Sequence, residues 1–379
     1  MEFSVKQSDL VRELNLSQGV VEKKTTIPIL SNVLIETGDG MIHLTATDLE
    51  LGVRCSCPAR IVKAGSGTLP ARRLLDYIRL LPDAEVNFKV MDNQWANIVC
   101  GRSRSRIAGM SRESYPELPQ MPPSLGEIPA AVLSGMIQKT IFGISSEESR
   151  FTLNGAQLLM TDSTLTMVAT DGHRLALVEN KVSNPSVEGV YKTLVPKKAM
   201  QELLKLAAEA EVGAMFQFSG DDNHLFFQLG ERLLLSRKLT GNFPDFDRVL
   251  PKTQTHQVHL GKDEIKSTVQ RVSQFSEERS KAIRLQFADG ELKIFSSMSE
   301  TGESEETIAI DYSGPATDIG FNAQYLLDFL GAIPEGAFSF LFNDAQSAGE
   351  MRPAAAGEGD KKGGEVGYTY RYVVMPMRI

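Results

Sequence analysis

The chain has 379 residues and a formal net charge of −8, with 42% hydrophobic and 23% charged residues. This length exceeds an ordinary single domain, so two or three domains are expected, and the composition excludes a globally disordered or fibrous chain. The acidic balance argues against a simple basic nucleic-acid binder but leaves room for one basic surface. We expect a cytoplasmic protein, because no apolar run approaches the ~18 residues that span a bilayer and the first residues lack a secretory pattern.

Three cysteines are too few, and an odd number, for a disulfide framework, which fits a reducing compartment. Cys55 and Cys57 form a Cys-x-Cys pair, but no second Cys/His pair at zinc spacing accompanies them. We therefore interpret Cys55 and Cys57 as small apolar strand residues, and we expect neither a metal nor a cofactor.

In chain order, the first 111 residues predict a strand, a helix, further strands, a second helix and closing strands. The first helix carries Leu10, Leu14 and other apolar residues at helical spacing, and the second opens at Pro70. Two helices and several antiparallel strands make an α+β domain with the helices on one side of the sheet. The predicted elements cover residues 3–5, 8–23, 41–47, 51–62, 70–82, 85–91, 95–101 and 104–111.

The second helix returns twice along the chain. Pro70, Pro196 and Asn322 each stand at the start of a predicted helix and are 126 residues apart. Leu74-Leu75-Asp76 returns as Leu326-Leu327-Asp328, at 252 residues, which is twice that period. A period of this size is a whole small domain rather than a solenoid repeat, so we predict three copies of one domain. Their boundaries are expected at 1–122, 123–251 and 252–379.

Two further blocks repeat between the first two copies. Tyr115-Pro116-Glu117-Leu118 returns as Phe243-Pro244-Asp245-Phe246, and Ala46-Thr47-Asp48 returns as Ala169-Thr170-Asp171. Asp48 and Asp171 are therefore interpreted as turn residues. Gly172-His173-Arg174, which follows Asp171, is specific to the second copy.

An enzymatic alternative rests on this same cluster. Asp171 and His173 would be the acid/base pair of a hydrolytic enzyme. No phosphate loop, nucleophile elbow or His-Glu-x-x-His motif accompanies them. A turn or a binding surface is the favoured interpretation, and we expect no catalytic residues.

Four segments fall outside the repeated elements. Residues 116–129 and 251–257 are interpreted as linkers, and the acidic residues 299–306 as a loop. Residues 352–369 are rich in Gly, Ala and charge and predict a mobile loop. The chain then ends in a predicted apolar strand over 372–379.

The charge is unevenly distributed between the predicted elements. The six predicted helices sum to +5, whereas the whole chain carries −8. Helices that face one way would form a weakly positive surface, which attracts phosphates without reading bases. Few aromatic residues accompany these charges, which disfavours a single-strand binder.

A resemblance to a known family rests on Thr26–Asn32, Ala169–Leu175, Gly241–Asp245 and Tyr372–Ile379. These segments resemble the bacterial β sliding clamp, the processivity subunit of the DNA polymerase III holoenzyme, and the resemblance covers the whole chain. It implies a non-catalytic DNA sliding clamp made of three α+β clamp domains. It also implies a head-to-tail homodimeric ring whose helices line a hole for duplex DNA and whose sheets form the outer wall.

The resemblance further implies DNA contacts without sequence specificity. Lys24 stands where the family often has arginine, and Thr152 where it often has a second aromatic residue, so both contacts differ from the family pattern. The implied DNA-binding residues are Lys24, Arg72, Arg150, Phe151 and Thr152.

A second implied site is a hydrophobic cleft for short linear peptides. The implied partners are the DNA polymerase III alpha subunit, the clamp loader, other polymerases and repair proteins. No contact with a membrane is implied. Met and Val would offer adaptable apolar walls, with His173 and Arg174 as polar contacts at the rim. The implied cleft residues are Leu153, Thr170, Gly172, His173, Arg174, Leu175, Pro244, Val249, Ala348, Val373, Val374, Met375, Pro376, Met377 and Arg378.

Overall fold

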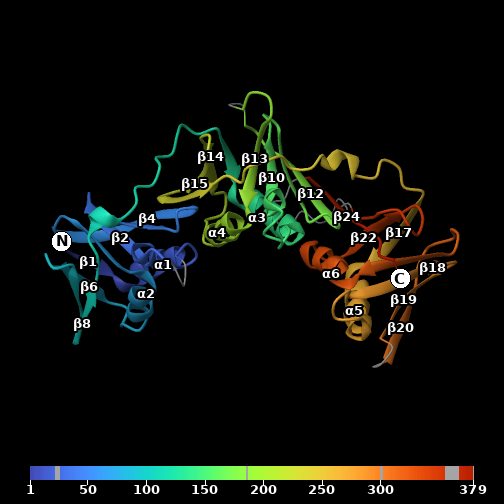
Figure 1. Ribbon diagram of the computed structural model, residues 1–379, viewed down its shortest axis with the longest axis horizontal. Helices are drawn as coiled ribbons and strands as arrows, with labels where there is room; N and C mark the ends of the chain where they lie inside the picture. The colour runs from blue at the N-terminus through green and yellow to red at the C-terminus, as the bar shows by residue number, and fades with distance from the viewer. Residues whose placement is uncertain (22–25, 185–186, 299–301, 355–366, 379) are drawn as a thin grey trace. The chain divides into compact units, whose positions relative to one another are not determined.

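Amphipathic segments at the repeat spacing form the helices of the protein. Residues 1–21, 26–184, 187–298, 302–354 and 367–378 are described in the computed structural model shown in Figure 1. No helix in these ranges is long and apolar enough to cross a membrane. The described α-helices are α1 Gln7–Gln18, α2 Ala71–Arg79, α3 Ala130–Thr140, α4 Lys197–Ala208, α5 Lys262–Val272 and α6 Ala323–Ala332.

The chain forms two units, which are considered separately: residues 1–134 with 195–238, and residues 135–194 with 239–379. In the first unit, one antiparallel sheet has the strand order β8-β7-β6-β1-β4-β16-β15-β14-β9, with β2, β3 and β5 attached through β3 to β4. Its strands are β1 Glu2–Lys6, β2 Asn32–Gly38, β3 Met41–Thr47, β4 Leu51–Lys63, β5 Ser66–Pro70, β6 Glu85–Val90, β7 Trp95–Cys100, β8 Ser103–Ala108, β9 Gly126–Pro129, β14 Met215–Gly220, β15 His224–Leu229 and β16 Arg232–Arg237.

Helices α1 and α2 pack together on this sheet. Leu14 of α1 and Leu74 of α2 are fully buried, and Phe3 stacks on Phe88 in the strands beneath, with ring centroids 4.8 Å apart. Helix α1 ends at Gln18, earlier than the predicted residue 23. A Cβ at Gly19, the next residue, would collide with the carboxylate of Glu202 on α4, so the close approach requires glycine there.

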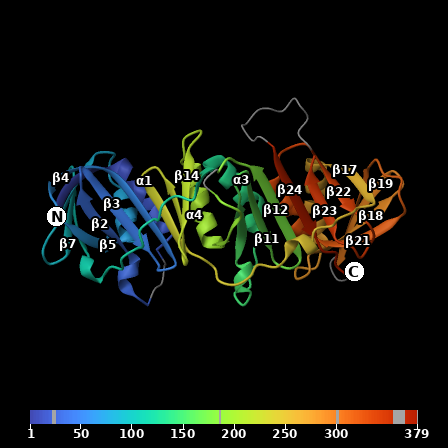
Figure 2. The ribbon, with the colours of Figure 1, turned by 90° about the horizontal axis from the view of Figure 1, so that it is seen from above.

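The second unit contains two sheets, with strand orders β13-β10-β11-β12-β24-β23-β22-β17 and β20-β19-β18-β21. Helices α5 and α6 pack against each other, and Figure 2 shows β24, β23, β22 and β17 side by side. The strands are β10 Gly155–Met160, β11 Thr164–Thr170, β12 Arg174–Lys181, β13 Tyr191–Pro196, β17 His256–Gly261, β18 Ala282–Ala288, β19 Glu291–Met298, β20 Gly302–Ala309, β21 Thr317–Asn322, β22 Ala337–Phe342, β23 Gly349–Pro353 and β24 Tyr368–Val374.

Successive repeats are joined by pairing the edge strands of their sheets. In the first unit β4 pairs with β16, and Gly52 lies opposite Leu235. In the second unit β12 pairs with β24, and Leu175 lies opposite Val373. We call these strand pairs the first and the second junction.

The acidic segment 299–306 was expected to form a loop, and this prediction is wrong for residues 302–306. These residues belong to β20, whose Glu305 lies opposite Phe295 of β19. The carboxylates are tolerated because β20 is an edge strand and its charged side chains reach solvent. Lys293 lies 3.0 Å from Glu305, and Arg271 of α5 lies 2.6 Å from Glu306. Residues 299–301 lie outside the described residues.

The C-terminal elements also differ from the prediction. Residues 352 and 353 belong to β23 and residues 368 and 369 to β24, while 355–366 lie outside the described residues. The last strand starts at Tyr368 and ends at Val374, rather than covering 372–379. Beyond it, Met377 makes a single bridge with Gly320, and Ile379 is again outside the described residues.

Candidate functional site

The two repeated aspartates shape the same turn in their two copies. One carboxylate oxygen of Asp48 accepts hydrogen bonds from the backbone N–H groups of Glu50 and Leu51, at 3.0 and 2.7 Å. The equivalent oxygen of Asp171 accepts from the N–H groups of His173 and Arg174, at 2.9 and 3.1 Å. The interpretation of both aspartates as turn residues is confirmed, and the match makes Leu51 the counterpart of Arg174.

Gly172 is the residue of this turn that only glycine suits. Its φ is +90°, and a Cβ there would lie 3.1 Å from an Nη atom of Arg150. The second carboxylate oxygen of Asp171 lies 3.1 Å from Nε of Arg174. Asp171 is thus occupied by backbone and by arginine, and in the described part of the chain no hydrogen bond joins it to the exposed ring of His173.

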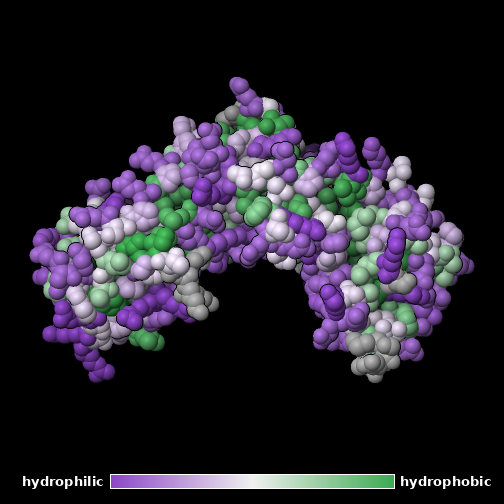
Figure 3. All heavy atoms as spheres, in the orientation of Figure 1, coloured by the Kyte–Doolittle hydropathy of each residue, from purple (hydrophilic) through white to green (hydrophobic). Residues whose placement is uncertain are grey.

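An apolar cluster lies on one face of the second junction. Leu175 and Leu177 of β12 alternate with residues that point to the other face, and Val168 of β11 and Val373 of β24 lie beside them. Partly buried hydrophobic residues pack against these four. We call the whole set the apolar cluster: Val168, Leu175, Leu177, Val373, Leu159, Phe243, Phe246, Leu250 and Ala348. Figure 3 shows hydrophobic side chains among hydrophilic ones over β12 and β24.

The segment that follows β16, residues 238–251 and called the linker from here on, supplies part of the cluster and is anchored through a buried ion pair. Glu350 is fully buried and lies 2.6 Å from Nε of Arg371 and 2.7 Å from Nε of Arg352. Arg371 also donates to the carbonyl oxygen of Pro251 at 3.0 Å. Burial by itself would raise the pKa of Glu350, but the hydrogen bonds from Arg371 and Arg352 outweigh it and lower that pKa.

The C-terminal segment lies against the turn of Asp171. The N–H of Met375 donates to the carbonyl oxygen of His173 at 2.9 Å, and the N–H of Met377 donates to that of Gly320 at 2.8 Å. Met375 remains 43% exposed and Val249 of the linker 45% exposed. Apolar side chains at this solvent-exposed rim are available for contact with another molecule.

The predicted cleft residues are therefore only partly brought together. Leu175, Val373 and Ala348 belong to the apolar cluster, and Pro244 and Val249 lie in the linker that covers it. Thr170 is buried and donates to the carbonyl oxygen of Arg174 at 2.6 Å. The remaining predicted residues border the turn, the short 3-10 helix Phe151–Leu153 or the last segment: Leu153, Gly172, His173, Met375, Pro376, Met377 and Arg378.

Arg174 and Val374 lie on the opposite face of the junction from the cluster, where they are paired with each other in the ladder. The Arg174 side chain is 9% exposed and makes an ion pair with Asp328 of α6, with Nη1 and Oδ2 2.5 Å apart. It is not the open rim contact that the sequence led us to expect. A rim position needs a free guanidinium, and this one is covered by the rings of Tyr325 and Phe142.

Sequence reasoning missed several members of the cluster. Leu177 stands two residues beyond Leu175, so the alternation of β12 could have placed it on the same face. Phe243 and Phe246 belong to a repeated block already recognised, but their partners in β11 and β12 lie about 70 residues earlier in the sequence. No sequence signal indicates Asp328 as a partner of Arg174, 154 residues away.

Three of the predicted DNA contacts are adjacent in the second unit. Arg150 donates to the carbonyl oxygen of Asp171 at 2.8 Å and lies 2.8 Å from Glu147. Phe151 is 69% exposed, and Thr152 is half-buried where Gly241 approaches it closely. Arg150 and Phe151 therefore present a cation and an aromatic ring to solvent.

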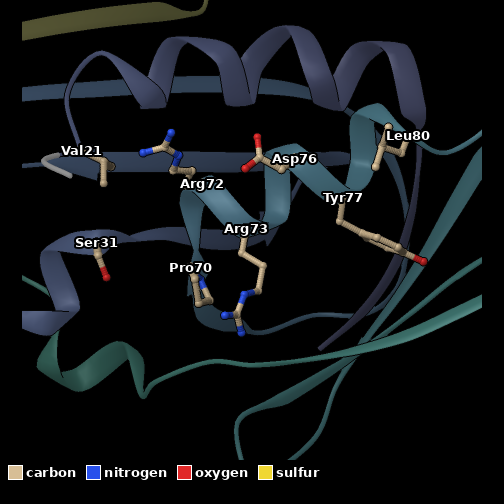
Figure 4. Close-up of a pocket in the computed structure, with 8 residues that line it drawn as sticks. All are labelled: Val21, Ser31, Pro70, Arg72, Arg73, Asp76, Tyr77 and Leu80. Atoms are coloured by element: carbon tan, nitrogen blue, oxygen red, sulfur yellow. The ribbon is translucent and has the colours of Figure 1, made fainter. Parts of the chain in front are cut away.

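Arg72 belongs to the first unit, and Lys24 lies outside the described residues. Figure 4 shows Arg72, Arg73 and Asp76 along α2 in a hollow of about 660 Å³, with Val21 and Ser31 at one end and Leu80 at the other. Two exposed guanidinium groups in one hollow favour an anionic ligand such as a phosphate. Within the described ranges, no group of three His, Cys, Asp or Glu residues could hold a metal ion.

Comparison with known proteins gives the family. The sequence models of the N-terminal, central and C-terminal domains of the DNA polymerase III beta subunit match residues 1–119, 127–245 and 247–360. The chain belongs to the DNA polymerase III beta subunit family. Curated relatives include the beta sliding clamp of Pseudomonas putida, 35% identical over the whole of both chains. That of Chlamydia muridarum is 31% identical over all of this chain and 99% of the relative.

Solved structures of the family agree. A sliding clamp from Pseudomonas aeruginosa bound to griselimycin is 32% identical with a TM-score of 0.91, and one from Bartonella birtlesii bound to griselimycin is 33% identical with a TM-score of 0.92. Both alignments cover all of each chain. The fold is therefore that of three α+β clamp domains, as the sequence predicted. The family is the non-catalytic processivity subunit of DNA polymerase III, and the alternative hydrolytic enzyme is not supported.

Proposed function

We propose that this chain is a DNA sliding clamp, a ring-shaped processivity factor that encircles duplex DNA and tethers the replicative polymerase to it. The observation that carries this proposal is the match of all three beta-subunit domain models, in order, along one chain. We place the domain boundaries at 1–122, 123–251 and 252–379, close to the repeat period of the sequence.

The open edges of the two outer sheets support a head-to-tail homodimer. Strand β8 ends the sheet of the first unit and exposes Arg104 and Arg106, whereas β20 ends a sheet of the second unit and exposes Glu303 and Glu305. Edges of opposite charge on one chain are complementary between two copies. Pairing β8 of each copy with β20 of the other satisfies both edges and closes a ring.

The mass in solution tests the ring. Light scattering at low and moderate protein concentration is expected to give twice 41.6 kDa. A mass of 41.6 kDa at every concentration would leave the domain fold standing but remove the ring, and with it the sliding mechanism.

DNA contacts are assigned to the predicted residues Lys24, Arg72, Arg150, Phe151 and Thr152. Exposed arginines attract phosphates without reading bases, so binding should be independent of sequence and weakened by salt. The modest charge of the helices, +5 over the six predicted segments, favours a lining that guides DNA and lets it slide.

The apolar cluster and its rim are assigned to partner peptides. Short linear motifs of the polymerase alpha subunit, the clamp loader, other polymerases and repair proteins would insert apolar side chains beside Val249 and Met375, where hydrophobic surface is already exposed at the rim of the cluster. Because similar clamps are found bound to griselimycin, we propose that this chain binds griselimycin at the same surface.

Two exposed valines of the second unit give a matched test of this surface. Val249→Ser should weaken griselimycin binding about tenfold, because it removes an apolar contact worth roughly 1–1.5 kcal/mol. Val190→Ser changes a valine that is 54% exposed outside the proposed surface, and should leave the affinity unchanged. Calorimetric titration measures both, and equal affinities for Val249→Ser and the native chain would overturn the assignment.

A further inference from the structure

We propose that Asp328 and Arg174 are positioning residues of the peptide-binding surface. They hold the two strands of the second junction from the face opposite the apolar cluster, and they do not contact the bound molecule. This inference rests on the function proposed for the apolar cluster. It gives a role to Gly172-His173-Arg174, the segment that distinguishes the second copy from the first.

The guanidinium of Arg174 is bound on every side. Nε lies 3.1 Å from Asp171, Nη1 lies 2.5 Å from Asp328 and 3.3 Å from the hydroxyl of Tyr372, and Nη2 donates to the carbonyl oxygen of Phe142. The ring of Tyr325 covers it, with its centroid 4.2 Å away. The partners come from the β11–β12 turn, α6, β24 and the short 3-10 helix Ile141–Gly143, so one side chain holds four segments together.

This hydrogen-bond network includes residues of β12 and β24, the same two strands that contribute Leu175 and Val373 to the apolar cluster. Arg174 precedes Leu175 on β12, and Tyr372 precedes Val373 on β24, so each network residue is next to a cluster residue that points to the other face. Tyr372 is fully buried, and its hydroxyl donates to the carbonyl oxygen of Tyr325 at 3.0 Å. A shift of the network therefore moves Leu175 and Val373, the buried residues on which the exposed rim of the cluster rests, although the network itself lies on the opposite face.

The first junction is held by a different set of ion pairs. Arg232 of β16 donates to the buried carboxylate of Glu13 on α1 at 2.8 and 3.0 Å, and Lys198 of α4 pairs with Asp48. The counterpart of Arg174 there is Leu51, which lies opposite Ser236. The counterpart of Asp328, 126 residues earlier, is Glu202, and it pairs with Lys205 of its own helix at 2.7 Å. An arginine at this strand position, bridged to an aspartate of the packed helix, thus occurs at the junction that carries the exposed apolar rim.

The first junction also differs on its other face. Its pair corresponding to Leu175 and Val373 is Gly52 and Leu235, and Leu118 packs so closely that a Cβ on Gly52 would lie 2.9 Å from it. Leu118 therefore fills this position in the first unit. At the second junction Phe246, the counterpart of Leu118, packs against the apolar cluster on this face, and Arg174 holds the same two strands from the opposite face.

The test is a double-mutant cycle on the full-length chain, with griselimycin as the probe in calorimetric titration. If the pair positions the strands, Asp328→Asn and Arg174→Gln each weaken binding about tenfold, and the double variant is no weaker than the weaker single variant. If Arg174 instead contacted the ligand directly, Asp328→Asn would free the guanidinium and leave binding unchanged or tighter. That result would overturn the proposal.

Controls separate positioning from general damage. Asp318→Asn removes an exposed carboxylate of the same unit that lies 3.4 Å from Arg284, and it should bind as the native chain does. Arg174→Lys keeps the bridge to Asp328 but loses the other bonds, so its affinity should fall between native and Arg174→Gln. Hydrogen exchange of Asp328→Asn should quicken at Leu175 and Val373 and remain native in β18 and β19. Exchange unchanged at these two residues would contradict the proposal.

The two hypotheses fail in different ways. Native chain that does not bind griselimycin would remove the proposed function of the cluster. Native chain that binds, together with Asp328→Asn that binds equally well, would remove only the positioning role.

Discussion

Glu350 shows how a single buried charge determines where the linker lies. Its carboxylate is fully buried between Arg371 and Arg352, and Arg371 in turn holds the carbonyl oxygen of Pro251 at the end of the linker. Removing the carboxylate leaves Arg371, whose side chain is only 22% exposed, without its charged partner, which costs more than the pair itself contributes. The residue therefore stabilises both the fold and the cover of the apolar cluster.

Glu350→Gln should destabilise the protein in a pH-dependent way. The hydrogen bonds of the arginines lower the pKa of Glu350 below its ordinary range, so its stabilisation is present above the unfolded pKa of ~4.3 and is lost as the pH falls through the folded pKa. At pH 7 the free energy of unfolding should drop by about 3 kcal/mol. Below pH ~4 the difference in free energy of unfolding between the variant and the native chain should shrink, as measured by urea unfolding at a series of pH values.

The matched control for this change is Glu2→Gln, which breaks the exposed pair with Lys89. Surface pairs are worth about 0–1 kcal/mol, so its effect should be small. If Glu350→Gln lowered the free energy of unfolding as little as the control does, the buried ion pair would not be what holds the linker.

At the scale of elements, the two edge strands are the least protected parts of the sheets. Strand β8 carries arginine and β20 glutamate at their exposed positions, which keeps either edge from pairing with its own kind. The same charges select one partner for each edge. This makes the proposed dimer contact testable without altering the core.

Charge reversal should exchange the partner preference of the edges. A chain with Arg104→Glu and Arg106→Glu should be monomeric, and so should a chain with Glu303→Arg and Glu305→Arg, because each places like charges opposite one another. Mixing the two variants restores opposite charges at both contacts, so light scattering should then give a dimer. Dimeric single variants, or a mixture that stays monomeric, would contradict the pairing of β8 with β20.

The sequence predicted the helices and strands better than the long-range side-chain contacts between them. Alternation placed β3 at Met41–Thr47 without error, and the repeat period located the helices α2, α4 and α6. Composition failed for Gly302–Ala309, because glutamates on an edge strand resemble those of a loop. Local patterns also failed for Arg174, whose burial depends on Asp328 and Tyr372, 154 and 198 residues away. Long-range contacts of this kind leave no periodic signal.

At the scale of the whole molecule, both the chain and the DNA it is proposed to encircle carry net negative charge. A net charge of −8 disfavours tight wrapping of DNA, and the exposed arginines of α2 and Arg150 supply only local attraction. Under the proposed contacts, we therefore expect retention on DNA to come from topology rather than affinity. The two-edge contact between copies would provide it by closing a ring.

The most direct measurement of this claim is retention on DNA of different topology. The native chain, loaded by its clamp loader onto nicked circular duplex, should stay with the circle through gel filtration in moderate salt. Cutting the same circle once should release it, because a ring slides off a free end. Equal retention on circular and linear DNA would mean ordinary surface binding, and would contradict the sliding clamp.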